Sequence, residues 1–344
     1  MRAERIAWAA GGIGIMGSVL GAVFQPDTFA YSWLAAASVW YRWPLGCLAL
    51  LLIHALTGGR WGVATRPWLM IGLATLPLLL PVIVPVLVLL QHLYPWARPD
   101  AHLDNAFYLN LRFAGGRWIF YLIVWFAIAG LAAMRVRRGG SIPGGFAAPA
   151  LIVLGLTANF AAYDAVLSLD PHFGSSDFGM VFNAEGGLFA LSVTIFGTVL
   201  TESLGASDRN DLGRLLQALL VLWAYLDFVQ FLIVWQSDLP REAAWYVPRA
   251  QGIWIAAAAL TALAHFLLPF ATLLFPRLRR SRRGLLAVTG LLIVMSVIRG
   301  WWLVLPAHER GVSWIDFAAV LALGGISAGL AMRGARGRPQ VAHA

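Results

Sequence analysis

The 344-residue chain contains no lysine, so all 25 of its basic residues are arginine, and it contains one cysteine, Cys47. One cysteine excludes a disulfide framework and any site built from several thiolates, such as an iron–sulfur cluster. Charged residues make up only 12% of the chain and apolar residues 60%, against roughly 25% and 45–50% in soluble domains. Because this composition cannot supply the polar surface of a soluble protein, it predicts a protein that spans a membrane many times.

Motifs of self-contained catalysis are also missing. The sequence has no glycine-rich phosphate loop, no HExxH zinc pattern and no GxSxG nucleophile elbow. Its paired glycines, such as Gly11-Gly12 and Gly324-Gly325, are typical of close helix packing and turns. Nothing in the sequence therefore supports self-contained hydrolytic catalysis.

The apolar residues fall into ten stretches, each long enough to cross a hydrocarbon core of about 30 Å as a helix. They are residues 6–23, 33–56, 67–91, 116–134, 148–168, 178–200, 212–236, 250–274, 285–305 and 314–332. The sequence thus predicts an all-α membrane protein with ten transmembrane helices in a single domain, 1–344. Pro77, Pro81 and Pro85, spaced by four, predict a kink in the third helix.

The placement of the arginines predicts the orientation of the chain. With the N-terminus inside, the cytoplasmic segments contain Arg2, Arg5, Arg60, Arg66, Arg135, Arg137, Arg138, Arg209, Arg214, Arg277, Arg279, Arg280, Arg282, Arg283, Arg333, Arg336 and Arg338. The opposite side contains only Arg98, Arg112, Arg117, Arg241, Arg249 and Arg310. This excess predicts that both termini are cytoplasmic. The net charge of +9 is then explained by arginines that lie on the cytoplasmic side, next to anionic lipid. Nucleic-acid binding is therefore not expected.

Aromatic residues gather near the predicted outer ends of the helices, where they are interpreted as an interfacial belt. They are Trp33, Trp96, Trp118, Trp235, Trp245, Tyr246, Trp301, Trp302 and Trp314.

Five ionisable side chains fall in the outer half of predicted helices: Arg42, Asp164, Glu185, Asp227 and Arg299. Such groups are costly in hydrocarbon and are functional candidates by default. Two interpretations stay open. One is an ion-pair staple between packed helices, with Asp227 or Glu185 neutralising an arginine. The other is a proton route or a quinone-headgroup site that opens to the outer face, in which Gln230, three residues after Asp227, shares a helical face.

Histidines leave two further alternatives. His54 and His265, in the inner half, are expected to carry protons or form hydrogen bonds, and the alternative is a pair of axial haem ligands. In the predicted outer loop 92–115, His92 and His102 suggest a metal, but the favoured interpretation is an ordinary solvated loop that also contains Asp104. No metal or haem site is expected on this chain.

Two long stretches carry a resemblance to a known family. One is AAYDAVLSLDPHFGSSDFG, residues 161–179, and the other is DLGRLLQALLVLWAYLDFVQFLIVWQSDLPREAAWY, residues 211–246. They are followed by AHFLLPF (264–270) and WWLVLPAH (301–308). This chain resembles the NrfD-like, polysulfide-reductase-like membrane subunit of bacterial alternative complex III, of the ActF type. Asp164, Ser168, Gln230 and the turn Asp170-Pro171-His172 match family motif positions.

The resemblance implies two four-helix bundles, from the second to the fifth and from the sixth to the ninth helix, plus two peripheral helices. It also implies a subunit of a quinol-oxidising respiratory complex in the bacterial inner membrane. Such a subunit has no metal of its own and contributes to the quinone environment or a proton pathway. Its partners would be iron–sulfur and cytochrome c subunits, which carry the iron–sulfur clusters and c-type haem, and a sister NrfD-like subunit.

Among the residues that depart from the family pattern, which include Arg241 after Pro240, two suggest a pair. Asp227 and Glu185 replace uncharged residues, and Arg299 replaces an aspartate. Since Asp227 and Arg299 have similar expected depths, we predict that they form an ion pair, with Glu185 or Arg42 as the alternative partner. Two other functions are weighed against the quinol complex. They are the membrane anchor of a polysulfide-reductase-type iron–sulfur or molybdenum oxidoreductase, and a transporter acting alone.

Overall fold

A computed structural model describes residues 2–101 and 105–336 of the chain. The chain is 85% helical, and no strand occurs in these two ranges. Ten of its helical segments are long and apolar enough to cross a membrane. The prediction of an all-α membrane protein with ten spans is therefore confirmed.

Half of the ten spans are built from several helical pieces. The first five spans comprise α1 (Arg2–Phe24); α2 (Pro26–Trp40) with α3 (Arg42–Thr57); α4 (Arg60–Ala74), η1 (Leu76–Leu78) and α5 (Leu79–Val88); α7 (Leu111–Arg137); and α8 (Gly144–Ala165) with η3 (Leu167–Leu169). The last five comprise α9 (Phe178–Thr201); α10 (Ala206–Ser237); α12 (Gly252–Leu260), η5 (Thr261–Leu267) and α13 (Leu268–Leu274); α15 (Arg282–Val304) with η6 (Leu305–His308); and α16 (Trp314–Arg336). Short helices in the connections are α6 (Leu90–Leu93), η2 (Pro95–Ala97), α11 (Pro240–Ala243), η4 (Pro248–Ala250) and α14 (Pro276–Arg280).

Prolines interrupt two spans. The predicted kink of the third span is present, because the helix changes to the 3₁₀ turn η1 around Pro77 before α5 begins. The second span is interrupted at Tyr41. Pro44 has no N–H to offer the carbonyl of Trp40, four residues earlier, so one helical hydrogen bond is missing next to the interruption.

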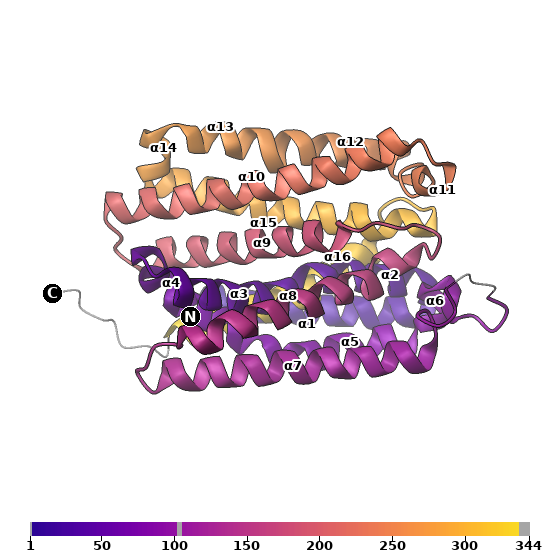
Figure 1. Cartoon of the computed structure of the whole chain (residues 1–344), viewed down its shortest axis with the longest axis horizontal. Helices are drawn as coiled ribbons and strands as arrows, with labels where there is room; N and C mark the ends of the chain where they lie inside the picture. The colour runs from indigo at the N-terminus through magenta and orange to yellow at the C-terminus, as the bar shows by residue number, and fades with distance from the viewer. Residues whose placement is uncertain (1, 102–104, 337–344) are drawn as a thin grey trace.

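The spans are arranged in two groups (Figure 1). α9, α10, α12–α13 and α15 form the upper half of the view, and α2–α3, α4–α5, α7 and α8 lie below them. α9 is central because it packs against α3, α8, α10 and α15. At the crossing of α9 and α3, a Cβ on Gly46 would lie only 2.8 Å from the backbone oxygen of Gly186, so two glycines permit this close approach.

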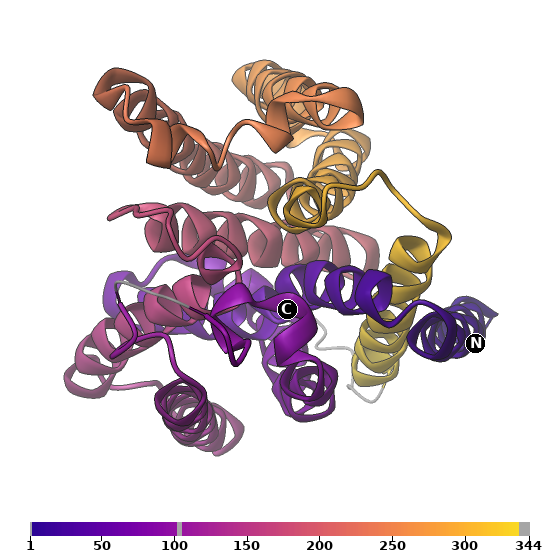
Figure 2. The ribbon, with the colours of Figure 1, turned by 90° about the vertical axis from the view of Figure 1, so that its right-hand side faces the viewer.

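α1 and α16 form a separate pair beside α2 (Figure 2). Glycine again allows the contact, since a Cβ on Gly14 would lie 2.1 Å from the backbone nitrogen of Ala322. Arg336 at the end of α16 forms an ion pair with Glu4 at the start of α1. Both ends of the described chain therefore lie at one end of the helices, which we call the terminal face; the opposite end is the far face.

The aromatic belt was predicted too broadly. Trp235 and Trp314 are exposed, as belt residues should be. Four others, Trp33, Trp96, Trp245 and Trp302, are buried in the core near the far face. Sequence depth alone cannot show the direction in which a ring points, and these four fill space between helices where short connections converge.

Candidate functional site

A cavity of about 620 Å³ lies between α10, the eighth span and α15. Aromatic side chains form much of its wall, among them Trp223, Phe228, Tyr246, Phe266 and Trp302. Asp227, Arg249 and Arg299 supply its charged groups. An apolar cavity with a few converging polar groups is the usual form of a small-molecule site.

The packing of α10 leaves room for the cavity in the half of the molecule nearer the far face. Near the terminal face, α10 packs against α13 and α14, and Arg279 of α14 donates hydrogen bonds to Asn210 and Gln217 of α10. Toward the far face the cavity takes the space between α10 and α12. Tyr225 and Phe228 of α10 and Ile255 of α12 line it and are about 60% exposed on the membrane-facing surface. An amphiphile could therefore enter from the hydrocarbon between these helices.

Asp227 of α10 and Arg299 of α15 form an ion pair at the wall of this cavity. The side chain of Arg299 is 6% exposed and that of Asp227 26%, so the carboxylate is the more accessible partner. The guanidinium carbon of Arg299 also lies 4.4 Å from the ring centroid of Trp302, a cation–π contact. The predicted pairing of these two residues is confirmed.

Gln230 follows Asp227 by three residues on α10 and so shares its helical face, as the sequence predicted. Its side-chain amide nitrogen lies 3.3 Å from the hydroxyl oxygen of Tyr246, to which it donates. Tyr246 lies in the connection between α11 and α12, and burial raises the pKa of its phenol. This hydrogen bond links α10, near the Asp227–Arg299 pair, to the connection between α11 and α12 at the far face.

Arg249 is a cavity residue that sequence reasoning missed. It was assigned to an outer loop on charge counting, yet its side chain is only 2% exposed. The short η4 turn at the far face directs it inward, between the rings of Trp245 and Trp302. No feature of the local sequence distinguishes this arginine from a solvated one.

His265 lies in a π-helical turn, η5, that borders the cavity. Its ring is fully buried and lies 4.4 Å, centroid to centroid, from that of Trp223. Within the described chain, neither ring nitrogen has a hydrogen-bond partner. Pro269 has no N–H for the carbonyl of His265, four residues before it, and this is a sequence signal for the departure from α-helix. π-helical turns are frequent at functional sites.

Glu185 of α9 pairs with Arg42 of α3, with 2.9 Å between Oε2 and Nη1. Both side chains are 2% exposed or less, and Arg42 also lies over the ring of Phe182. The pair bridges the two helix groups at the glycine crossing of α3 and α9. His265 is within electrostatic range of Glu185, Arg42 and Arg299.

Asp164, for which the sequence suggested no charged partner, forms an ion pair with Arg117 of α7. Its two carboxylate oxygens accept hydrogen bonds of 2.9 and 2.8 Å from Arg117 of α7, and Tyr121 donates a third of 3.0 Å. Arg117 was expected at the outer edge, but α7 begins five residues before the predicted span. Asp164 is therefore part of an ion-pair staple between α7 and α8, outside the cavity between α10 and α15.

The matching motif around Asp170 forms the turn between α8 and α9. The Asp170 carboxylate accepts a hydrogen bond from the backbone N–H of His172, and Ser168 donates to the carbonyl of Asp164. Arg241 of α11 donates to the carbonyl of His172, which links the turn that contains Pro171 to α11. In this structure the motif has a structural role at the far face.

The remaining histidines lie away from the cavity. His54 is near the terminal end of α3, where its Nε2 is 3.0 Å from the carbonyl oxygen of Gly59, so it is not beside His265. His92 pairs with Asp27 at 2.5 Å, and His102 and Asp104 lie outside the described residues. Over residues 2–101 and 105–336, no cluster of three His, Cys, Asp or Glu side chains could hold a metal.

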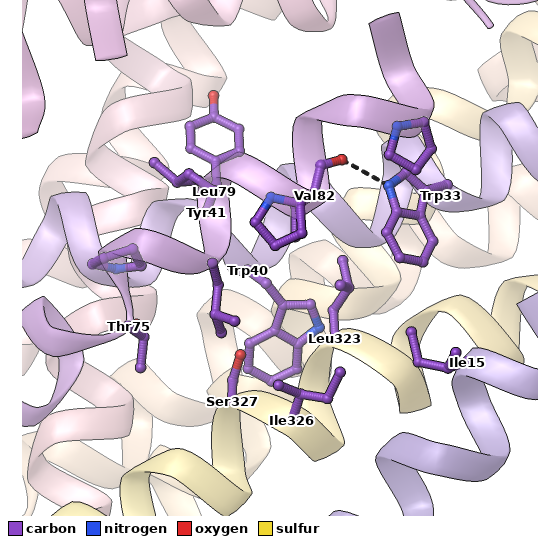
Figure 3. A pocket seen from close by; sticks show the side chains of 14 residues that line it. Ile15, Trp33, Trp40, Tyr41, Thr75, Leu79, Val82, Leu323, Ile326 and Ser327 are labelled. Carbon is purple, nitrogen blue, oxygen red and sulfur yellow. Dashed lines mark hydrogen bonds between the residues drawn. The ribbon is translucent and has the colours of Figure 1, made fainter. Parts of the chain in front are cut away.

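A smaller cavity of about 200 Å³ lies between α1, α2, α5 and α16. Its wall is almost entirely apolar, and Trp33 donates a hydrogen bond across it to the carbonyl of Val82 (Figure 3). It has no ionisable group except the phenol of Tyr41. The larger cavity is therefore the better candidate for chemistry.

Neither a scan against protein-family models nor a search of curated proteins finds a match for this chain. The resemblance to the membrane subunits of alternative complex III therefore rests on the sequence motifs alone.

Proposed function

We propose that this chain is the membrane subunit of a quinol-oxidising respiratory complex and that the cavity between α10, α12 and α15 binds the quinone headgroup. The observation that carries the proposal is a membrane-facing aromatic cavity with the Asp227–Arg299 pair at its wall. A quinone has a flat ring, two carbonyl oxygens and an isoprenoid tail. Aromatic walls suit the ring, polar side chains suit the oxygens, and an opening to hydrocarbon accommodates the tail.

Quinol oxidation releases protons, and the residues behind the cavity suit their transfer. Asp227 lies at the wall, His265 is buried in η5, which borders the cavity, and Glu185, at the α3–α9 crossing, is within electrostatic range of both. A carboxylate, an imidazole and a second carboxylate can exchange protons in turn when water or side-chain motion joins them. In this proposal Asp227 is the first proton acceptor.

Partners and orientation follow from the sequence resemblance and arginine placement. We expect iron–sulfur and cytochrome c subunits and a sister NrfD-like subunit to accept the electrons that this chain cannot carry itself. We place the complex in the bacterial inner membrane with the terminal face in the cytoplasm. The cavity would then take its quinol in the outer half of the membrane.

A cavity-filling substitution tests the headgroup site. Ala258 of α12 lines the cavity, and Ala258→Trp would fill the space that a quinone ring needs. Ala127→Trp, on an exposed position of α7, is the matched control. We expect Ala258→Trp to weaken quinone binding and quinol oxidation at least tenfold and the control to change neither. Equal quinol oxidation by the two variants would contradict the proposal that this cavity binds the quinone headgroup.

Purification from native membranes tests the assignment to a complex. We expect iron–sulfur and c-haem absorbance to co-purify with the tagged chain in fixed proportion. A molybdenum-containing partner would instead favour the polysulfide-reductase-type anchor, and a chain that purifies alone and remains active in transport would contradict both.

A further inference from the structure

Arg249 is held in the far-face wall of the cavity without a carboxylate partner. Its Nη1 donates to the carbonyl of Trp245 and its Nη2 to that of Leu303, both at 2.6 Å. Its guanidinium carbon lies 3.3 Å from the ring centroid of Trp245. Nε, buried in the same wall, has no hydrogen-bond partner in the described part of the chain.

The charges around the cavity do not balance. Asp227 and Arg299 neutralise each other, which leaves the positive charge of Arg249. No ion pair of the described residues includes Arg249. Asp170 is within electrostatic range but makes no direct contact that neutralises it, and Arg299 acts on it with like charge.

Burial without a counter-charge has a measurable consequence. Loss of hydration lowers the pKa of Arg249 to about 9, so the group stays charged at neutral pH at a free-energy cost. An anion in the cavity would remove part of that cost, because a buried charge is stabilised by an opposite charge nearby. Guanidinium groups also donate strongly to ionised oxygens.

We propose that the cavity selects a headgroup that carries a negative charge, with Arg249 donating to its ionised oxygen. This inference rests on the proposed function and narrows it: the bound species is the singly deprotonated quinol rather than the neutral one. The quinol hydroxyl loses its proton on binding, and the O–H electron pair stays on the oxygen that faces Arg249. Asp227, at the same wall, is the acceptor for that proton.

Two probes separate charge selection from simple binding. One is an alkylated 2-hydroxy-1,4-naphthoquinone, whose acidic hydroxyl is ionised at neutral pH. The other is its 2-methoxy counterpart, which cannot ionise. Both are titrated into the purified complex in zwitterionic lipid nanodiscs, with quenching of tryptophan fluorescence as the readout. Arg249→Gln removes the charge and keeps a planar amide, and Arg249→Lys keeps the charge.

We expect the wild-type protein to bind the hydroxy probe at least tenfold more tightly than the methoxy probe. Arg249→Gln should bind the two probes with equal affinity, and its binding of the methoxy probe shows that the cavity is intact. Arg249→Lys should retain part of the preference. If Arg249→Gln does not fold, the inference is tested by the relative affinities of the two probes for the wild-type protein and for Arg249→Lys.

Several outcomes would overturn the inference. The wild-type protein could bind both probes equally, or Arg249→Gln could keep the full preference. Displacement of the hydroxy probe by phosphatidylglycerol in the nanodisc, lost in Arg249→Gln, would assign the anion site to a lipid headgroup instead. If neither probe binds the wild-type protein, the proposed quinone site is wrong, and this result differs from equal binding of both probes, which overturns only the charge selection.

Discussion

Asp227 and Arg299, 72 residues apart in the chain, form an ion pair that links α10 to α15 and lines the cavity between them. Each charge is stabilised by the other inside the membrane. The pair therefore has a structural role and is also the polar wall of the proposed quinone site.

The first prediction is a double-mutant cycle on this pair. Asp227→Asn leaves Arg299 charged and largely buried, and should lower the free energy of unfolding by roughly 3 kcal/mol. Adding Arg299→Leu should restore much of that loss, because the uncompensated charge is removed. Thermal unfolding of the purified protein measures both steps. Strictly additive effects would reject the coupling.

The second prediction compares a buried pair with an exposed one. Glu185→Gln leaves Arg42 buried without a counter-charge and should cost roughly 3 kcal/mol of stability. Asp211 pairs with Arg60 at 2.8 Å, but the two side chains are 35% and 67% exposed. Asp211→Asn is therefore the matched control and should cost less than about 1 kcal/mol. A similar loss in both variants would show that burial does not decide the contribution.

The third prediction concerns orientation and uses the fact that the native cysteine, Cys47, is fully buried. A cysteine at Ser203 is at the terminal face, and one at Ser176 is at the far face; both positions are exposed. In intact spheroplasts a membrane-impermeant maleimide should label Ser176→Cys and leave Ser203→Cys unlabelled, as the arginine excess requires. The reverse pattern would mean that the terminal face is outside.

The fourth prediction separates proton transfer from binding. His265→Phe keeps an aromatic ring against Trp223 but removes the ionisable group. Quinol oxidation by the complex should fall about tenfold or more while quinone affinity stays unchanged. His54→Phe, near the terminal end of α3, is the control and should leave oxidation unaffected. Full activity in His265→Phe would remove this histidine from the proton route.

The spans were predictable because twenty-residue apolar stretches are a strong signal and small errors at their ends do not change the count. The pairing of Asp227 with Arg299 followed from their opposite charge and similar depth. The partner of Asp164 did not, since the position of Arg117 depends on where α7 begins, and helix ends are the least certain feature of a sequence.

Other features of the site depend on the direction of single side chains. Arg249 points inward because the η4 turn lies over the cavity, and four tryptophans face the core for a similar reason. Spacing within one helix cannot supply such information, because it arises from contacts between residues far apart in the chain. The π-helical turn at His265 had a local signal in Pro269, but its place beside the cavity comes from the packing of three spans.

Photoaffinity labelling with an azidoquinone tests the central claim most directly. The probe is illuminated in membranes that contain the assembled complex, and labelled peptides are mapped by mass spectrometry. The account predicts labels on the cavity-lining parts of α10 and the eighth span, around Phe228 and Ala262, and their loss when excess unlabelled quinone is present. Labelling confined to other segments, such as those around the smaller cavity at Trp40 and Leu323, would contradict it.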